Sequence, residues 1–277
     1  MNFSPEIKKS EPINTLKGEH LNEGTKPIIG CIYNRNELTH EDDIFFNNFK
    51  KNATFVDFSI NREDAKKEGF YTSGKKTYII SKIDKENKFS EKYYDCTGVF
   101  ATGLDINNGE NISFLSHQNP EEFLKNPKIL SNLKEDLNKS LNELIKRSKP
   151  GSIDVAVLGG NKNILAFNAI DSVDFDKMNT KQMYDFFEKQ NPGSFDDYKK
   201  SIYFLSKIIF DKLNFYPTIT SGPNSNVKLG DITHDNHSDL YCDTKNRRIY
   251  QIRPENESIN NESFMGDEIN NKIKDFN

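Results

Sequence analysis

The chain has 277 residues, 34% hydrophobic and 29% charged, with a formal net charge of −4. Acidic and basic residues are interleaved, so the general electrostatic footprint of a nucleic-acid-binding protein is missing. Three cysteines without a Cys-x-x-Cys pair argue against a disulfide framework and against a cysteine-ligated zinc site.

The chain begins with a polar stretch. Residues 1–26 are rich in Lys, Glu and Asn and show no periodicity, so we expect a disordered leader. This stretch lacks the apolar segment of a secretory signal peptide, and no apolar run in the chain is long enough to span a membrane. We therefore expect a cytoplasmic protein, or one that reaches a host cell by a route that needs no signal peptide.

Short strands are predicted before residue 90. The apolar run Pro27–Tyr33 is typical of a buried strand, and Thr54–Ile60 and Thr77–Ile83 alternate like strands. A short helix is expected around Glu41–Phe49.

A β-hairpin is predicted next. Cys96–Thr102 is small and β-prone, Ile112–Leu115 resumes as a strand, and Asn-Asn-Gly at 107–109 favours a tight reversal between them. Antiparallel pairing brings the outer ends of a hairpin together, so Cys96 and His117 are expected to lie near each other.

Two amphipathic helices follow. Apolar residues spaced by three and four predict a helix within Pro120–Arg147, starting after Pro127, and a second helix over Asp197–Leu213. Between them, Ile153–Leu158 is a buried-strand candidate that ends at Gly159-Gly160. Residues 174–195 are expected to form an insertion with a helix near 181–189.

The C-terminal part predicts strands again. A strand over Pro217–Thr220 and a Gly/Asn-rich loop at 221–226 precede a hairpin formed by Asp239–Asp243 and Arg248–Ile252; from residue 254 onward we expect a polar tail. The order of elements predicts an α+β fold, with mixed or antiparallel β-sheets packed against two main helices. We place it in a single domain over residues 27–253.

The predicted hairpin juxtaposes a thiol and an imidazole. A cysteine attacks as the thiolate, and a neighbouring imidazole can take its proton and later return one to leaving ammonia or amine. The alternative is that Cys96 is a small buried hydrophobe and His117 a polar residue at a strand end. The pairing alone leaves both interpretations open.

The order of elements around this pair resembles the chemoreceptor glutamine deamidase (CheD-type) family and the wider cysteine-hydrolase fold of the cytotoxic necrotizing factors. The likeness covers about residues 88–252. Its features are a cysteine that opens a strand, a histidine that ends the next, the Gly-Gly turn after Val155–Leu158, the helix and strand over 204–219, the loop at 222–226 and the closing hairpin at 240–249. The resemblance implies a CheD-like core with an N-terminal extension.

The resemblance also implies an activity: thiol-dependent conversion of a protein glutamine to glutamate with release of ammonia, in the manner of a bacterial effector or toxin. The partner would be a protein that carries the target glutamine, and no cofactor is expected. Such deamidases use a hydroxyl residue shortly before the cysteine, usually threonine, to orient the histidine. The matching position here is Ser90.

The oxyanion formed on attack needs hydrogen-bond donors, for which the backbone N–H groups of Cys96, Thr97 and Gly98 are candidates. Gly98 also permits a close approach of substrate, and Gly159 and Gly160 are expected to border the pocket. The alternatives are plain strand packing for Gly98 and a tight turn without substrate contact for the Gly-Gly pair.

Other candidates are assigned different roles. Cys31 has His40 nearby but a charged segment between them, and we expect Cys31 and Cys242 to be core residues. The histidines and aspartates at 231–239 are too loosely spaced for us to assign a metal. Two rival functions remain: a non-catalytic protein-binding module on the same fold, suggested by the serine at position 90, and a metal-assisted Cys/His hydrolase.

Overall fold

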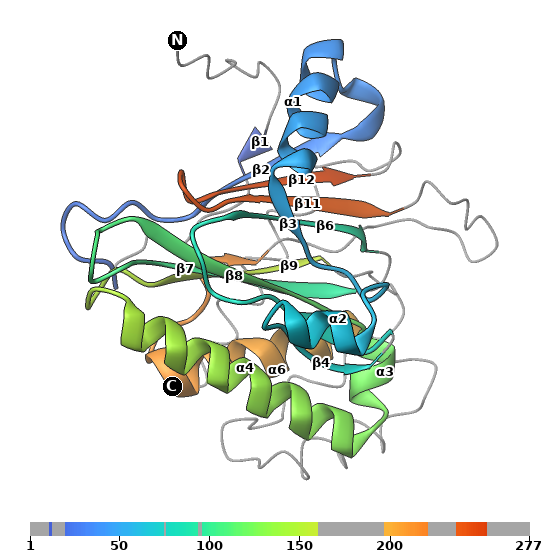
Figure 1. Cartoon of the computed structure of the whole chain (residues 1–277), viewed down its shortest axis with the longest axis vertical. Helices are drawn as coiled ribbons and strands as arrows, with labels where there is room; N and C mark the ends of the chain where they lie inside the picture. Colours follow the sequence, from blue (N-terminus) through green and yellow to red (C-terminus); the bar gives the residue numbers. More distant parts are fainter. Residues whose placement is uncertain are drawn as a thin grey trace.

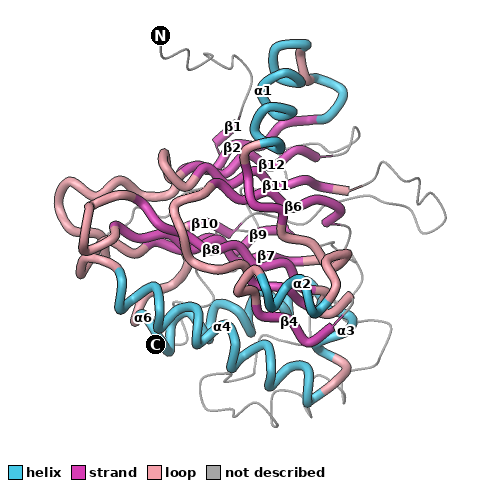
Figure 2. The backbone as a smooth tube through the Cα atoms, in the orientation of Figure 1, coloured by secondary structure: helices cyan, strands magenta, loops and turns pink. Residues whose placement is uncertain are grey.

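The computed structural model describes residues 11–12, 20–74, 76–93, 96–159, 197–220 and 237–253. Within them, two six-stranded sheets pack face to face, and helices cover both outer faces (Figures 1 and 2). The predicted α+β class, with mixed sheets and two main helices, is confirmed.

Sheet A joins strands from both ends of the chain. Its order is β1 (Glu11–Pro12), β2 (Ile29–Asn34), β12 (Arg248–Arg253), β11 (Ser238–Asp243), β6 (Asn87–Tyr93) and β3 (Ala53–Phe55). The β2–β12 and β3–β6 pairs are parallel and the others antiparallel. The predicted closing hairpin is confirmed as β11–β12.

Sheet B carries the predicted central hairpin. Its order is β10 (Ile219–Thr220), β9 (Asp154–Gly159), β7 (Thr97–Leu104), β8 (Asn111–Gln118), β5 (Tyr78–Ile80) and β4 (Tyr71–Gly74). Strands β7 and β8 pair antiparallel, with Phe100 opposite Leu115 and Leu104 opposite Asn111. The Asn-Asn-Gly reversal therefore joins them as expected.

Five α-helices lie within the described residues, and the first four begin at side-chain caps. They are α1 (His40–Lys51), α2 (Arg62–Lys67), α3 (Pro120–Leu124), α4 (Pro127–Arg147) and α6 (Asp197–Leu213), with a 3-10 turn at Arg35–Glu37. The Asn126 side chain accepts hydrogen bonds from the N–H groups of Lys128 and Ile129, and Pro127 occupies the first turn. The predicted start of this helix is confirmed. Sequence reasoning missed the short helices α2 and α3.

Three apolar layers hold the molecule together. Leucines of α4 and apolar residues of α6 pack on the outer face of sheet B, and Phe46 and Phe49 of α1 pack on the outer face of sheet A. The middle layer lies between the sheets and contains Cys96, Phe100 and Leu115. This layer buries the candidate site.

Some sequence-based expectations are wrong. The strand predicted over Thr54–Ile60 ends at Phe55 as β3. It ends there because Asp57 accepts a hydrogen bond from the Ser59 N–H and turns the chain toward α2. The strand predicted over Thr77–Ile83 is limited to Tyr78–Ile80.

The leader predicted as disordered has defined contacts at its described residues. Glu11 and Pro12 pair with β2, and the Asn22 N–H and side-chain amide donate to the Gly151 and Pro150 carbonyls at 2.8 Å each. Polar composition did not reveal these partners, which lie far along the chain. The predicted features at 174–195, 221–226 and 254–277 lie outside the described residues.

Among the helices that the structure describes, none combines the length and apolar character needed to cross a membrane.

Candidate functional site

Cys96 and His117 lie at the same end and on the same face of sheet B. Cys96 immediately precedes β7, and His117 is the last residue but one of β8. Thr97 is opposite Gln118, so the next pair in register sets Gly98 opposite His117. Because side chains alternate along a strand, Cys96 and His117 both project toward sheet A. Cys96 is 8% exposed and His117 is 1% exposed.

A hydrogen bond between the sheets orients the imidazole. Ser90 of β6 lies with its Oγ 3.0 Å from His117 Nδ1, and the Ser90 hydroxyl donates to the Val56 carbonyl. Ser90 Oγ therefore accepts from Nδ1–H, which leaves Nε2 with its lone pair. Nε2 is buried and has no hydrogen-bond partner within the described part of the chain. The contact is the one that the family resemblance implied for Ser90.

Asp57 is a residue that sequence reasoning missed. One oxygen of its buried carboxylate lies 3.8 Å from His117 Nδ1, and the other accepts from the Ser59 N–H at 2.8 Å. The signal was an aspartate inside the apolar run TFVDFSI. A carboxylate on the Nδ1 side of a catalytic imidazole stabilises the imidazolium that forms during proton transfer.

Two aromatic rings enclose the imidazole. Tyr93 stacks on His117 with centroids 4.0 Å apart and an interplanar angle of 12°, and Phe58 contacts the ring at 4.0 Å. Burial lowers the pKa of His117 to about 3, although Asp57 and the Val56 carbonyl favour the charged form. His117 is therefore neutral at pH 7.

The two described candidate glycines border Tyr93. A Cβ on Gly98 would lie 2.7 Å from the Ser116 carbonyl oxygen and 3.0 Å from Tyr93 Oη. Gly159, at a φ of +83°, would place a Cβ 2.7 Å from the Cys96 carbonyl oxygen and 2.9 Å from Tyr93 Cδ1. The expectation that Gly98 admits substrate is corrected, since the space on its Cβ side is filled by Tyr93 and Ser116. Gly160 lies outside the described residues.

The Thr97 side chain points away from this site. Its Oγ1 lies 2.6 Å from Ser201 Oγ of α6, on the helix-covered face of sheet B. Thr97 can therefore contribute to an oxyanion site through its backbone N–H but not through its side chain.

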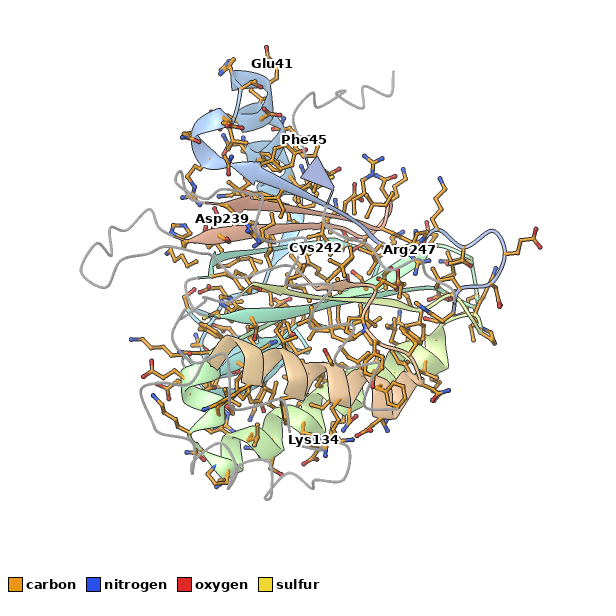
Figure 3. The ribbon with its side chains drawn as sticks, turned by 180° about the vertical axis from the view of Figure 1, so that it is seen from behind. Glu41, Phe45, Lys134, Asp239, Cys242 and Arg247 are labelled. Carbon is orange, nitrogen blue, oxygen red and sulfur yellow. The ribbon has the colours of Figure 1, made fainter. Side chains whose placement is uncertain are left out.

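The other cysteines occupy different surroundings. Cys242 is fully buried in the middle layer (Figure 3), where burial raises the pKa of its thiol, so the prediction of a core residue is confirmed. Cys31 is only half-buried, at the edge of the outer layer around α1.

The Arg35 guanidinium contacts residues 237–239, the described part of the segment of histidines and aspartates at 231–239. Arg35 pairs with Asp239 at 3.1 Å and donates to the His237 carbonyl at 3.1 Å. No group of three or more metal-ligating side chains occurs within the described ranges.

Comparisons of the chain with family models, with curated proteins and with solved structures give no match. The candidate site is therefore defined by its own geometry. It consists of a thiol and a neutral imidazole at one end of a β-sandwich, with a hydroxyl and a carboxylate on the Nδ1 side of the ring.

Proposed function

We propose that this protein is a thiol-dependent amidohydrolase that converts a glutamine side chain of a target protein to glutamate and releases ammonia. Cys96 is the nucleophile, His117 the general base and acid, and Ser90 and Asp57 position His117. The observation that carries the proposal is the Ser90–His117 hydrogen bond, because it assigns the tautomer that can accept a thiol proton at Nε2.

The first half-reaction forms a thioester. The Cys96 thiol passes its proton to His117 Nε2 as the sulfur attacks the amide carbon, and the backbone N–H groups of Thr97 and Gly98 are candidate donors to the oxyanion. The C–N bond then breaks, and His117 returns the proton to the leaving ammonia. Since His117 is neutral at pH 7, we expect proton transfer to accompany attack rather than precede it.

The second half-reaction consumes one water. His117 takes a proton from the water as its oxygen attacks the thioester, and the C–S bond breaks to release glutamate and regenerate the thiol. The product carries one more negative charge than the substrate. Such a change disables a target site that needs a neutral amide.

The test is ammonia release from a mixture of glutamine-bearing proteins. We expect Cys96→Ser to abolish release while the near-ultraviolet circular dichroism of the folded protein is retained. Cys31→Ser, which removes a thiol outside the site, should leave release unchanged. Release by Cys96→Ser at the native rate would show that the mechanism is wrong.

A non-catalytic binding module is the second candidate, favoured by the burial of Cys96 and His117 and by the Tyr93 and Phe58 rings that enclose His117. The rate of alkylation by iodoacetamide separates the two, because an activated thiol reacts faster than an ordinary one. A catalytic Cys96 should react far faster than Cys31 and Cys242. Equally slow alkylation of all three favours the binding module.

A further inference from the structure

Strand β6 carries a β-bulge between Ser90 and Tyr93. Two residues of β6, Glu91 and Lys92, lie opposite one residue of β11, Asp239. In a regular strand, residues three apart point to opposite faces of the sheet. The extra residue of the bulge cancels this alternation, so Ser90 and Tyr93 both point into the layer between the sheets. One strand therefore brings a hydroxyl and an aromatic ring to the same imidazole.

The bulge is held in a costly backbone conformation. Lys92 has a φ of +65°, in the left-handed region that few residues other than glycine adopt. Its N–H donates to an Asp239 carboxylate oxygen at 3.2 Å, and its side chain is 59% exposed. Burial of the lysine therefore does not offset the cost of this conformation. Such strain beside a candidate site supports a role there for the side chain that the bulge aims.

Two glycines leave room for the Tyr93 ring on sheet B. A Cβ on Gly98 of β7 would lie 3.0 Å from Tyr93 Oη, and a Cβ on Gly159 of β9 would lie 2.9 Å from Tyr93 Cδ1. The ring therefore lies against two neighbouring strands at positions without side chains. The Tyr93 hydroxyl donates to the Ser116 carbonyl at 3.3 Å. Together these contacts fix the orientation of the ring.

The fixed ring lies flat against His117. The two ring centroids are 4.0 Å apart and the interplanar angle is 12°. An imidazole that rotated about its Cβ–Cγ bond would collide with Tyr93, because packed interiors leave no room for such a turn. Nδ1 therefore stays 3.0 Å from Ser90 Oγ, which leaves Nε2 as the proton acceptor.

The stack becomes stronger when His117 is charged. An aromatic face attracts a cation, so it favours the imidazolium over the neutral imidazole. Tyr93 itself stays uncharged, because burial raises the pKa of its phenol well above its usual value. The ring therefore stabilises the state that proton transfer creates more than the state from which it starts, and only such a difference accelerates a chemical step.

We propose that Tyr93 is a positioning residue of the proposed amidohydrolase, which holds His117 in the orientation that makes Nε2 available to the Cys96 thiol. The proposal rests on the proposed function for the reaction that His117 catalyses. It also gives Gly98 and Gly159 a role, since a side chain at either position would displace the Tyr93 ring.

The experiment makes two measurements on the full chain. One is the rate at which iodoacetamide alkylates Cys96, relative to Cys31 in the same sample. The other is the tautomer of His117, from proton–nitrogen correlation spectra of protein labelled at histidine. We expect Tyr93→Leu to slow alkylation of Cys96 roughly tenfold to a hundredfold and to populate both tautomers. Tyr93→Phe keeps the ring, so it should restore the native tautomer and most of the rate.

Tyr78→Leu is the matched control, because it removes a fully buried tyrosine from the other face of sheet B, in the layer beneath α4. It should lower the free energy of unfolding and leave the Cys96 alkylation rate and the His117 tautomer unchanged.

If Tyr93→Leu does not fold, substitutions of the exposed Lys92 decide the question. Lys92→Val should slow alkylation of Cys96, because a β-branched residue disfavours the left-handed conformation that aims Tyr93. Lys92→Gly, which removes the same side chain but suits that conformation, is its control. Alkylation at the native rate in both variants would overturn the proposal.

A purely packing role for Tyr93 gives another result. Tyr93→Leu would then unfold more readily but keep the native tautomer and alkylation rate, and the proposal would be wrong. Failure of the proposed function is distinguishable, because the native chain would release no ammonia and Cys96 would be alkylated as slowly as Cys242. The His117 tautomer in the native chain and in Tyr93→Leu would still decide whether Tyr93 positions the imidazole.

Discussion

Ser90 offers the sharpest test among single residues, because its hydroxyl joins the Val56 carbonyl to His117 Nδ1. Without that acceptor, Nδ1–H keeps only the more distant Asp57 carboxylate and the Val56 carbonyl, so the ring is held less firmly in the tautomer that leaves Nε2 unprotonated. We expect Ser90→Ala to slow alkylation of Cys96 and ammonia release roughly tenfold to a hundredfold. Ser90→Thr should restore both rates, because threonine keeps the hydroxyl.

A purely structural role for Ser90 predicts a different outcome. Ser90→Ala would then lower the free energy of unfolding and leave the alkylation rate of the folded protein unchanged. The alkylation rate of Cys31, measured on the same protein sample as that of Cys96, supplies the internal control.

His117 also predicts how stability changes with pH. Its pKa lies near 3 in the folded protein and about 6.5 in the unfolded chain, so the unfolded chain binds more protons between these values. Stability is therefore fully present above pH 6.5 and falls as the pH decreases, by up to about 1.4 kcal/mol per pH unit from this group. Urea unfolding at pH 7, 6 and 5 measures this change in the free energy of unfolding. His117→Asn should make the free energy of unfolding depend less on pH. An unchanged dependence would contradict a lowered pKa for His117 in the folded protein.

At the scale of elements, sequence patterns predicted the turns and helices that depend on residues close together in the chain. Asn107-Asn108-Gly109 predicted the β7–β8 reversal, and the leucine spacing predicted α4, because both depend on near neighbours. The pairing of β6 with β3 and β11, which carries Ser90 to His117, joins distant segments and has no local signature. Asp57 was missed for the same reason, since its partner lies sixty residues along the chain.

Helix α4 is expected to supply much of the stability of the layer on sheet B. Leu137 is fully buried there, so Leu137→Ala should cost about 2–5 kcal/mol of unfolding free energy by removing buried methyl groups and leaving a cavity. Ser131→Ala, on the exposed face of the same helix, should change stability by less than about 0.5 kcal/mol. Urea denaturation of both variants gives the comparison. Equal losses of unfolding free energy in the two variants would contradict the burial of Leu137 against sheet B.

At the scale of the whole molecule, the two ends of the sandwich differ in chemistry. One end holds the enclosed thiol and imidazole. The other end holds a cavity whose lining includes Lys26, Asp243 and the turn at 245–248. The sequence suggested the first site, because a family pattern places a cysteine and a histidine on one hairpin. The sequence did not suggest the cavity at the other end, because Lys26 and the 245–248 turn are brought together only when β2 pairs with β12.

The same long-range assembly makes the segment before β2 part of the folded unit. His20 stacks on Phe215 with centroids 3.6 Å apart, and Asn22 bonds to the loop at 150–151. We expect His20→Ala/Asn22→Ala to lower stability by about 1–2 kcal/mol, or the melting temperature by roughly 2–8 °C. Glu23→Ala, at an exposed neighbour, serves as the control in differential scanning calorimetry. If the double variant melts with the native chain, these contacts add nothing and the folded domain begins near residue 27, as its composition predicted.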